Sequence, residues 1–385
     1  MPHFPGTIAS KLPRVGTTIF TVMSRLAAEH KAINLSQGFP DFDCAPELRA
    51  LFTKYINAGL NQYPPMAGVA PLREAIAEKT AGLYGAAYDP EHEITVTPGA
   101  TYGIFTAIAA MVRPGDEVIL FEPAYDSYAP AVEVNGGRPV YVQLRFPDYS
   151  IDWREVHNAI TPRTRMIVIN TPNNPTASVF SAEDLRLLEG MLRGTDITVV
   201  SDEVYEHIVF DGCRHQSVAS FPGLAERSFV VSSFGKTYHV TGWKMGYVLA
   251  PRELMAEFRK VHQFNVFVAN GPIQYALADY MKRKDAYLEL AAFYQKKRDF
   301  FLEGIRSSRF QPLPSRGTFF QNLRYDAISD EKDSDLAVRL TRERGVAAIP
   351  VSAFYREPPP HKVLRFCFAK SEETLAKGAE ILSRI

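Results

Sequence analysis

The sequence has few of the features that mark the more specialised classes of protein. Its 385 residues include only three cysteines, Cys44, Cys213 and Cys367, and no two of them form a Cys-x-x-Cys pair. A structural zinc site or a disulfide framework is therefore not expected, and no metal is predicted. No apolar run approaches the ~18 residues of a transmembrane helix, and the N-terminus lacks the layout of a signal peptide. These absences predict a cytoplasmic protein.

An excess of charge of either sign is also missing. The 43 basic residues are balanced by 43 acidic residues, so no overall field attracts nucleic acid or anionic lipid. The composition, 46% hydrophobic and 22% charged, is ordinary for a globular protein. The length predicts two or three domains, and we find no internal repeats.

Short apolar runs typical of buried strands alternate with helical periods along the middle of the chain. The runs are 93–97, 117–121, 139–144, 166–170, 197–201, 228–232 and 246–250. The helical periods between them include 101–112, 152–160 and 181–193. This alternation predicts an α/β fold with a mostly parallel sheet that helices cover on both faces.

The pattern changes after residue 285. Residues 285–308 have the pattern of one long helix, and shorter strands and helices follow it. We therefore expect a large α/β domain over residues 46–285. A smaller α/β domain would be formed by residues 1–45 together with residues 286–385.

Polar residues follow the predicted strands at the point where each strand ends. They are Gly99, Ala100 and Thr101, then Tyr125, Asn174, Asp202, Tyr205, Ser233 and Lys236. Each has a simple explanation as a turn, a helix cap or a packing tyrosine. Ligands of open α/β sheets, however, bind outside the carboxyl ends of the strands. Together these residues predict one binding site at one edge of the sheet.

The tripeptide Gly235-Lys236-Thr237 also occurs in phosphate-binding P-loops. A P-loop needs a second glycine five positions before Gly235, where Val230 stands instead. The preceding segment SFVVSS is an apolar run without the glycine-rich loop that would wrap phosphates. We therefore reject the P-loop interpretation.

The stretch SFGKTYHVTGWKMGY (233–247) resembles the lysine signature of the class I and II aminotransferases, which are pyridoxal-phosphate enzymes of fold type I. The resemblance continues through SDEVYEH, NTPNNPTA, FEPAYDSY, NLSQGFPDF and VLRFCFA, in the order of that family and over nearly the whole chain. It is closest to the branch that contains the bacterial methionine aminotransferases and the kynurenine–oxoglutarate (glutamine K) transaminases.

The resemblance implies that Lys236 forms a Schiff base with pyridoxal 5′-phosphate and later moves a proton as acid and base. Asp202 would pair with the pyridine nitrogen, an interaction of about 4 kcal/mol at ~4 Å and an effective dielectric constant of ~20. Asn174 and Tyr205 would hydrogen-bond the 3-oxygen of the ring, and Tyr125 would stack on its face.

The resemblance also assigns the phosphate and the substrate carboxylate. Phosphate would be bound at a helix start and by neighbouring side chains: Gly99, Ala100, Thr101, Ser233 and Lys244. Tyr63 would reach the phosphate from the partner subunit of a homodimer. Arg365 would bind the substrate carboxylate with its planar fork, assisted by Asn174 and the backbone of Gly38.

Three residues depart from the common family pattern. Lys244 stands where many members have arginine, although lysine is usual in the branch named above. Ala177 replaces a common glycine, and Gly235 replaces a frequent serine.

The predicted function is the transfer of an amino group from an L-amino acid to a 2-oxo acid by a ping-pong route. The stretch 262–272, HQFNVFVANGP, lacks the arginine that would bind a distal carboxylate in the aspartate branch. Phe264 and Phe267 instead favour methionine, glutamine, kynurenine-like or aromatic donors.

Two alternatives follow from the same fold. One is a carbon–sulfur β-lyase that acts on cystathionine or cysteine conjugates. The other is a transcription regulator, which would carry an added basic DNA-binding domain that we do not expect in this chain. Neither nucleic acid nor membrane is a predicted partner.

Overall fold

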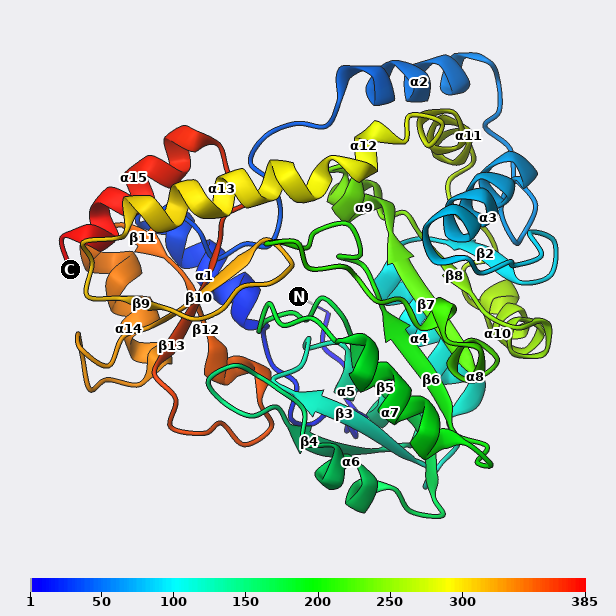
Figure 1. Cartoon of the computed structure of the whole chain (residues 1–385), viewed down its shortest axis with the longest axis horizontal. Coiled ribbons are helices and arrows are strands. Elements are labelled where there is room, and N and C mark those ends of the chain that lie inside the picture. The colour runs from blue at the N-terminus through cyan, green and yellow to red at the C-terminus, as the bar shows by residue number, and fades with distance from the viewer. Residues whose placement is uncertain (1) are drawn as a thin grey trace.

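The computed structural model describes residues 2–385, and its largest element is a sheet of seven strands in the order β2-β8-β7-β6-β5-β3-β4 (Figure 1). The strands are β2 (Ile94–Thr97), β3 (Glu117–Glu122), β4 (Arg138–Gln143), β5 (Thr164–Asn170), β6 (Thr198–Asp202), β7 (Ser228–Ser233) and β8 (Gly246–Leu249). Strand β8 runs antiparallel to both of its neighbours, and the other neighbouring pairs are parallel. The prediction of a mostly parallel sheet is confirmed.

Helices cover both faces of this sheet. One face packs against α4 (Ala100–Met111), α5 (Tyr128–Val134) and α10 (Arg252–Asn265). The other face packs against α2 (Pro46–Asn57), α3 (Ala70–Tyr84), α6 (Trp153–Ala159), α7 (Ala182–Leu192), α8 (Pro222–Ala225) and α11 (Gly271–Tyr280). Since both faces are buried, the strands are continuous apolar runs rather than alternating ones.

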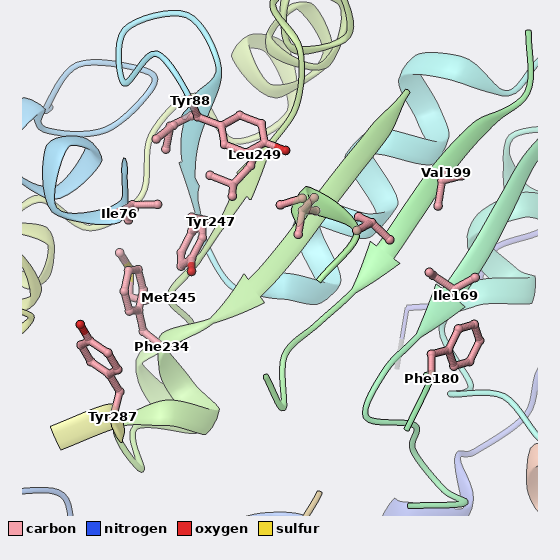
Figure 2. Packing of buried hydrophobic residues seen from close by; sticks show 14 of the residues in the cluster. Ile76, Tyr88, Ile169, Phe180, Val199, Phe234, Met245, Tyr247, Leu249 and Tyr287 are labelled. Atoms are coloured by element: carbon pink, nitrogen blue, oxygen red, sulfur yellow. The ribbon is translucent and has the colours of Figure 1, made fainter. Parts of the chain in front are cut away.

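Alternate residues of each strand enter different cores. In β3, Ile119 and Phe121 belong to the cluster on the α3 and α7 face, while Val118 and Leu120 belong to the cluster under α4 and α5. Figure 2 shows the first of these clusters, in which Ile169, Val199 and other strand residues project from one face of the sheet. This two-sided burial holds the carboxyl ends of the strands rigidly in place.

A second group of elements is built from both ends of the chain (Figure 1). An antiparallel sheet has the order β12-β13-β10-β9, and a parallel pair joins β1 to β11. These elements are β1 (Ile33–Asn34), β9 (Gln311–Pro312), β10 (Phe320–Arg324), β11 (Val346–Ala347), β12 (Ile349–Pro350), β13 (Val363–Cys367), α1 (Ile19–Glu29), α14 (Asp333–Arg339) and α15 (Glu372–Ser383). Apart from β9, whose two residues are exposed, these elements share one buried core. The division into domains at residues 45 and 285 is retained as our proposal.

The single helix expected over residues 285–308 is instead two helices. They are α12 (Asp285–Leu288) and α13 (Leu290–Gly304). Glu289 lies between them with φ −86° and ψ −3°, a ψ well away from the regular α-helical value, and the regular helix is interrupted there. Figure 1 shows α13 running from the large sheet region towards α15.

Among residues 2–385, no helix has both the length and the apolar character that a membrane crossing requires. Within the same range, no group of three or more His, Cys, Asp or Glu side chains is arranged to hold a metal ion.

Candidate active site

A cavity of about 150 Å³ lies at the carboxyl ends of β5, β6 and β7, beside the start of α4. Ten of the predicted site residues line it: Gly99, Ala100, Thr101, Tyr125, Asn174, Asp202, Tyr205, Ser233, Lys236 and Lys244. They come from five separate stretches of sequence, and the parallel sheet brings them together because its strand ends share one edge.

Lys236 lies in α9 (Phe234–Thr237), the single helical turn that directly follows β7. Its Nζ atom donates a hydrogen bond to the carbonyl oxygen of Gly38 at 3.2 Å. Burial, together with the positive charges of Arg365 and Lys244, lowers the pKa of Lys236 to about 8. The neutral amine, which is the nucleophilic form, is therefore accessible near neutral pH.

Asp202 is the last residue of β6, and only 4% of it is exposed. Its Oδ2 atom accepts a hydrogen bond from the Tyr128 hydroxyl at 2.5 Å, and Oδ1 accepts one from the Val204 backbone N–H at 3.3 Å. Burial raises the pKa of Asp202 to about 6, although these hydrogen bonds and Lys236 oppose the increase. At neutral pH the carboxylate is ionised, and it can face a protonated ring nitrogen.

Asn174 and Tyr205 lie beside these two residues. The Asn174 backbone N–H donates to the Asn170 side chain at 2.7 Å, which fixes the turn after β5. Tyr205 is 3% exposed, and its ring meets that of Phe319 edge-on at 5.0 Å. Burial raises the pKa of Tyr205, so its hydroxyl is a hydrogen-bond donor at neutral pH.

Arg365 lies in β13, opposite Asn322 of β10, and is 1% exposed. Its Nη1 atom donates to Asn174 Oδ1 at 2.5 Å, and Nη2 donates to the Ser36 carbonyl at 3.3 Å. The guanidinium lies 3.8 Å from the centre of the Phe320 ring. Burial lowers its pKa to about 10, so it stays charged at neutral pH. Within residues 2–385 its Nε atom has no acceptor, which leaves a buried donor available to a carboxylate.

The start of α4 forms the other end of the cavity. Gly99 precedes this helix with φ +90°, a conformation that favours glycine, and no side chain in the described chain caps the helix. A Cβ atom on Gly99 would lie 3.3 Å from Nζ of Lys244. The free N–H groups of Ala100 and Thr101 therefore share a small space with a cation, as an anion site requires.

Three predicted residues do not line the cavity. Arg365 borders it through Asn174, and the Gly38 carbonyl contacts Lys236. The packing around Gly38 is tight, since a Cβ atom there would lie 2.8 Å from the Phe320 ring. Tyr63 is 82% exposed, and its ring packs against Phe267 rather than in the cavity.

The cavity lining also includes Tyr128, Asn170, Val204 and Met245, which were not among the residues predicted from the sequence. A signal existed for Tyr128, since it follows the predicted residue Tyr125 by three positions. A backbone turn, in which the Tyr128 N–H donates to the Tyr125 carbonyl oxygen, brings the two rings together. Asn170 ends its strand in the same way as Asp202, and that position could have identified it.

The two departures from the family pattern outside the phosphate site have structural consequences. Ala177 is fully buried with φ +61°, in the left-handed region where glycine is favoured. A Cβ atom on Gly235 would lie 3.1 Å from Thr241 Cα, so a larger residue would need a small backbone shift.

These groups fit pyridoxal phosphate. The helix start and Lys244 match a phosphate, the buried Asp202 matches a ring nitrogen, and Lys236 lines the same cavity as the amine. The glycine at position 99 leaves open the space that a phosphate needs, because any Cβ atom there would enter it.

Comparisons with known proteins agree with this chemistry. The family model "Aminotransferase class I and II" matches residues 30–382. Methionine aminotransferase of Escherichia coli (strain K12) is 50% identical over 386 residues, which cover 100% of both chains. The solved structure of YbdL from Escherichia coli, described as having a methionine aminotransferase function, has a TM-score of 0.97 at 50% identity and covers 99% of this chain and 100% of that chain.

A more distant relative is kynurenine–oxoglutarate transaminase 1 of Mus musculus. It is 35% identical over 404 residues, which cover 95% of each chain. The resemblance inferred from the lysine signature is confirmed. The chain therefore belongs to the class I and II aminotransferases, and it is a pyridoxal-phosphate-dependent aminotransferase.

Proposed function

We propose that the enzyme moves the amino group of methionine, glutamine, a kynurenine-like or an aromatic L-amino acid to a 2-oxo acid at the cavity beside Lys236. The observation that carries the proposal is the convergence of Lys236, Asp202 and the buried Arg365 around one small cavity.

When bound, pyridoxal phosphate supplies the electron sink that makes the substrate α-carbon acidic. Lys236 would hold the cofactor covalently, and its Nζ atom would then take up and return the proton of the substrate α-carbon. Its lowered pKa suits this work, since a base acts best when its pKa lies near the operating pH.

The other side chains orient and stabilise the reacting groups. Arg365 would bind the substrate carboxylate, and the Phe320 ring that packs against its guanidinium group restricts the rotation of that group. Asp202 would face the ring nitrogen and keep it protonated. Tyr205 and Asn174 would face the ring oxygen, and Tyr125 would cover the ring.

The choice of amino donors rests on the stretch 262–272. It contains no arginine, and it carries Phe264 and Phe267, which are 86% and 41% exposed. A distal carboxylate would find no cation there, whereas an apolar side chain would find aromatic surface. The names of the bacterial and mouse relatives, methionine aminotransferase and kynurenine–oxoglutarate transaminase, support apolar and aromatic donors.

We also propose a homodimer in which Tyr63 of each subunit reaches the phosphate of the other. The exposure of Tyr63, together with that of its neighbour Phe267, supports this proposal, because exposed aromatic groups mark interfaces. The cytoplasmic location remains a prediction from the dispersed cysteines.

The test is a screen of amino donors against several 2-oxo acids with the purified enzyme. We expect methionine and glutamine to be used, and aspartate to be a poor donor. An aspartate kcat/KM equal to or above that of methionine would contradict the apolar pocket. The relatives described above are aminotransferases and do not support the carbon–sulfur β-lyase. Release of pyruvate from cystathionine without an added oxo acid would favour it.

A further inference from the structure

Tyr128 contacts the most deeply buried acid of the active site. It is the first residue of α5 and is 4% exposed. Its hydroxyl donates a hydrogen bond to Asp202 Oδ2 at 2.5 Å. Burial raises the pKa of Tyr128 well above its ordinary value, so the hydroxyl keeps its proton and remains a donor.

This hydrogen bond completes a two-sided support of the carboxylate. The Val204 N–H holds Oδ1, and the Tyr128 hydroxyl holds Oδ2. A carboxylate has about four lone-pair positions, so each oxygen keeps one that can point into the cavity. With both oxygens held, Asp202 cannot turn about its side-chain bonds without breaking a hydrogen bond.

The hydroxyl of Tyr128 differs from those of three other buried tyrosines. Tyr88, Tyr149 and Tyr294 also bury their hydroxyls, but within residues 2–385 these have no hydrogen-bond partner. The fold therefore tolerates tyrosine where only the ring is needed for packing. The ring of Tyr128 packs in the core under α5, yet its hydroxyl meets Asp202, whose carboxylate lines the cavity.

Tyr128 is also linked to the residue expected to cover the cofactor ring. The rings of Tyr125 and Tyr128 meet edge-on, with centres 5.7 Å apart and planes at 74°. Both side chains come from the segment that starts α5. One helix start therefore fixes both the ring cover and the carboxylate.

We infer that Tyr128 is a positioning residue that holds Asp202 in the orientation and the ionised state needed to bind the cofactor's ring nitrogen. The inference rests on the role of Asp202 in the proposed function. Tyr128 would act through Asp202 and would not itself touch the cofactor's reacting atoms.

The expected effect follows from the charges around Asp202. The titratable groups that face it are Tyr128 and Tyr125 at the start of α5, Lys236 of α9, and Glu203 and Tyr205 of its own turn. Among them, the Tyr128 hydroxyl donates directly to the carboxylate and so favours its ionised form. Without it the pKa of Asp202 rises above its present value of about 6.

The experiment compares Tyr128→Phe with Tyr149→Phe, the matched loss of a buried hydroxyl that has no partner in the described chain. In Tyr128→Phe we expect the dissociation constant of pyridoxal phosphate to rise roughly tenfold to a hundredfold, the range for loss of a hydrogen bond to a charged group. We expect kcat to fall, while the KM for methionine changes little because Arg365 is untouched. Tyr149→Phe should change the coenzyme affinity by no more than about twofold.

A second measurement uses the cofactor-free protein. Folding raises the pKa of Asp202. The contribution of Asp202 to the free energy of unfolding is therefore most favourable at low pH and is lost as the pH rises through the folded-state pKa. In Tyr128→Phe the folded-state pKa of Asp202 should be higher, so the loss of stability should continue to a pH about one unit higher than in the wild type. Thermal unfolding measured from pH 4 to 8 would detect the shift independently of catalysis.

A double-mutant cycle with Asp202→Asn separates the inference from the proposed function. If Tyr128 acts through Asp202, Tyr128→Phe should add little to the coenzyme affinity lost in Asp202→Asn. Fully additive losses, or a Tyr128→Phe variant that matches Tyr149→Phe, would overturn the inference. If Asp202→Asn alone leaves coenzyme affinity and turnover unchanged, the role proposed for Asp202 fails instead.

Discussion

Two regions of the chain differ sharply. One is the floor of the active site, formed by Lys236, Asp202, Asn174 and Arg365. The other is a group of exposed aromatic residues, Tyr63, Phe264 and Phe267, which we propose as the edge of the site. On the floor, Asp202 is 4% exposed and Arg365 is 1% exposed, and both are held by hydrogen bonds. On the edge, Tyr63 is 82% exposed and Phe264 is 86% exposed. The floor is held by hydrogen bonds within one chain, whereas the proposed edge exposes apolar aromatic surface to water. In the proposed homodimer, the edge is the part of the site that the second chain would complete.

The largest expected effect concerns the floor. In Lys236→Ala, kcat should fall by at least about 10⁴-fold, because the amine that holds the cofactor and moves the proton is lost. Borohydride reduction of the wild-type holoenzyme should fix the cofactor to one peptide, the one that contains Lys236. A label on Lys244 would show that the floor has been assigned incorrectly.

The second prediction is that Asp202, which the floor needs for catalysis, lowers the free energy of unfolding of the cofactor-free protein. In Asp202→Asn, kcat should fall about 10²- to 10³-fold, the range for removing one preorganised group that stabilises the transition state electrostatically. The cofactor-free variant should nevertheless be more stable than wild type at pH 8. The reason is that folding raises the Asp202 pKa from 3.8 to about 6, which destabilises the wild-type protein as the pH rises through this window.

The stability difference at pH 8 should be roughly 2–3 kcal/mol, as follows from a shift of about two pKa units. It should be absent near pH 4, where the carboxyl of the folded protein is protonated. Thermal unfolding of the two cofactor-free proteins at both pH values is the measurement. A variant that is equally destabilised at pH 4 and pH 8 would argue against a buried charge as the cause.

The third prediction asks whether the edge acts in the partner's site. Tyr63→Ala should lower activity by about tenfold to a hundredfold, as for loss of a hydrogen bond to a charged group. Tyr63→Ala chains are then co-refolded with Lys236→Ala chains. If Tyr63 acts across the interface, each mixed dimer has one site with neither defect, and activity rises above that of both parents. Dimers that have exchanged subunits but recover nothing would place Tyr63 in its own subunit's site.

The fourth prediction uses two phenylalanines of matched exposure. Phe267 on the edge is 41% exposed, and Phe300 on α13 is 42% exposed. Phe267→Ala should raise the KM for methionine about threefold to tenfold, because the substrate side chain would lose apolar contact worth ~1 kcal/mol. Phe300→Ala should leave KM unchanged. Equal effects of the two substitutions on KM would show that the edge does not take part in substrate binding.

The smallest effect is expected at Ala177, which lies in the loop that carries Asn174. Its φ of +61° disfavours any residue with a Cβ atom, but its methyl group is fully buried. In Ala177→Gly the relief of backbone strain and the lost packing have opposite signs, so the free energy of unfolding should change by less than ~1 kcal/mol. Denaturant unfolding would check this, and a larger loss would show that the methyl group supports the floor.

Most of the floor was predictable because its residues stand at the ends of recognisable strands. The carboxyl ends of parallel strands meet at one edge, so Lys236, Asp202 and Asn174 could be placed together without coordinates. The helix break at Glu289 could not be predicted, because residues 285–308 keep a helical pattern throughout. The contact between Tyr128 and Asp202 joins residues 74 positions apart and has no sequence signature.

The sequence by itself determined the chemistry and the fold class. The chemical functions of a lysine, an aspartate and an arginine are properties of the side chains themselves. Continuous apolar runs between helices are typical of strands in a sheet that is covered on both faces. Only the tertiary structure decided the electrostatic state of the site, because a pKa depends on burial and on neighbours that are distant in the chain. It lowered the pKa of Lys236 to about 8, raised that of Asp202 to about 6, and left Tyr63 exposed at the surface.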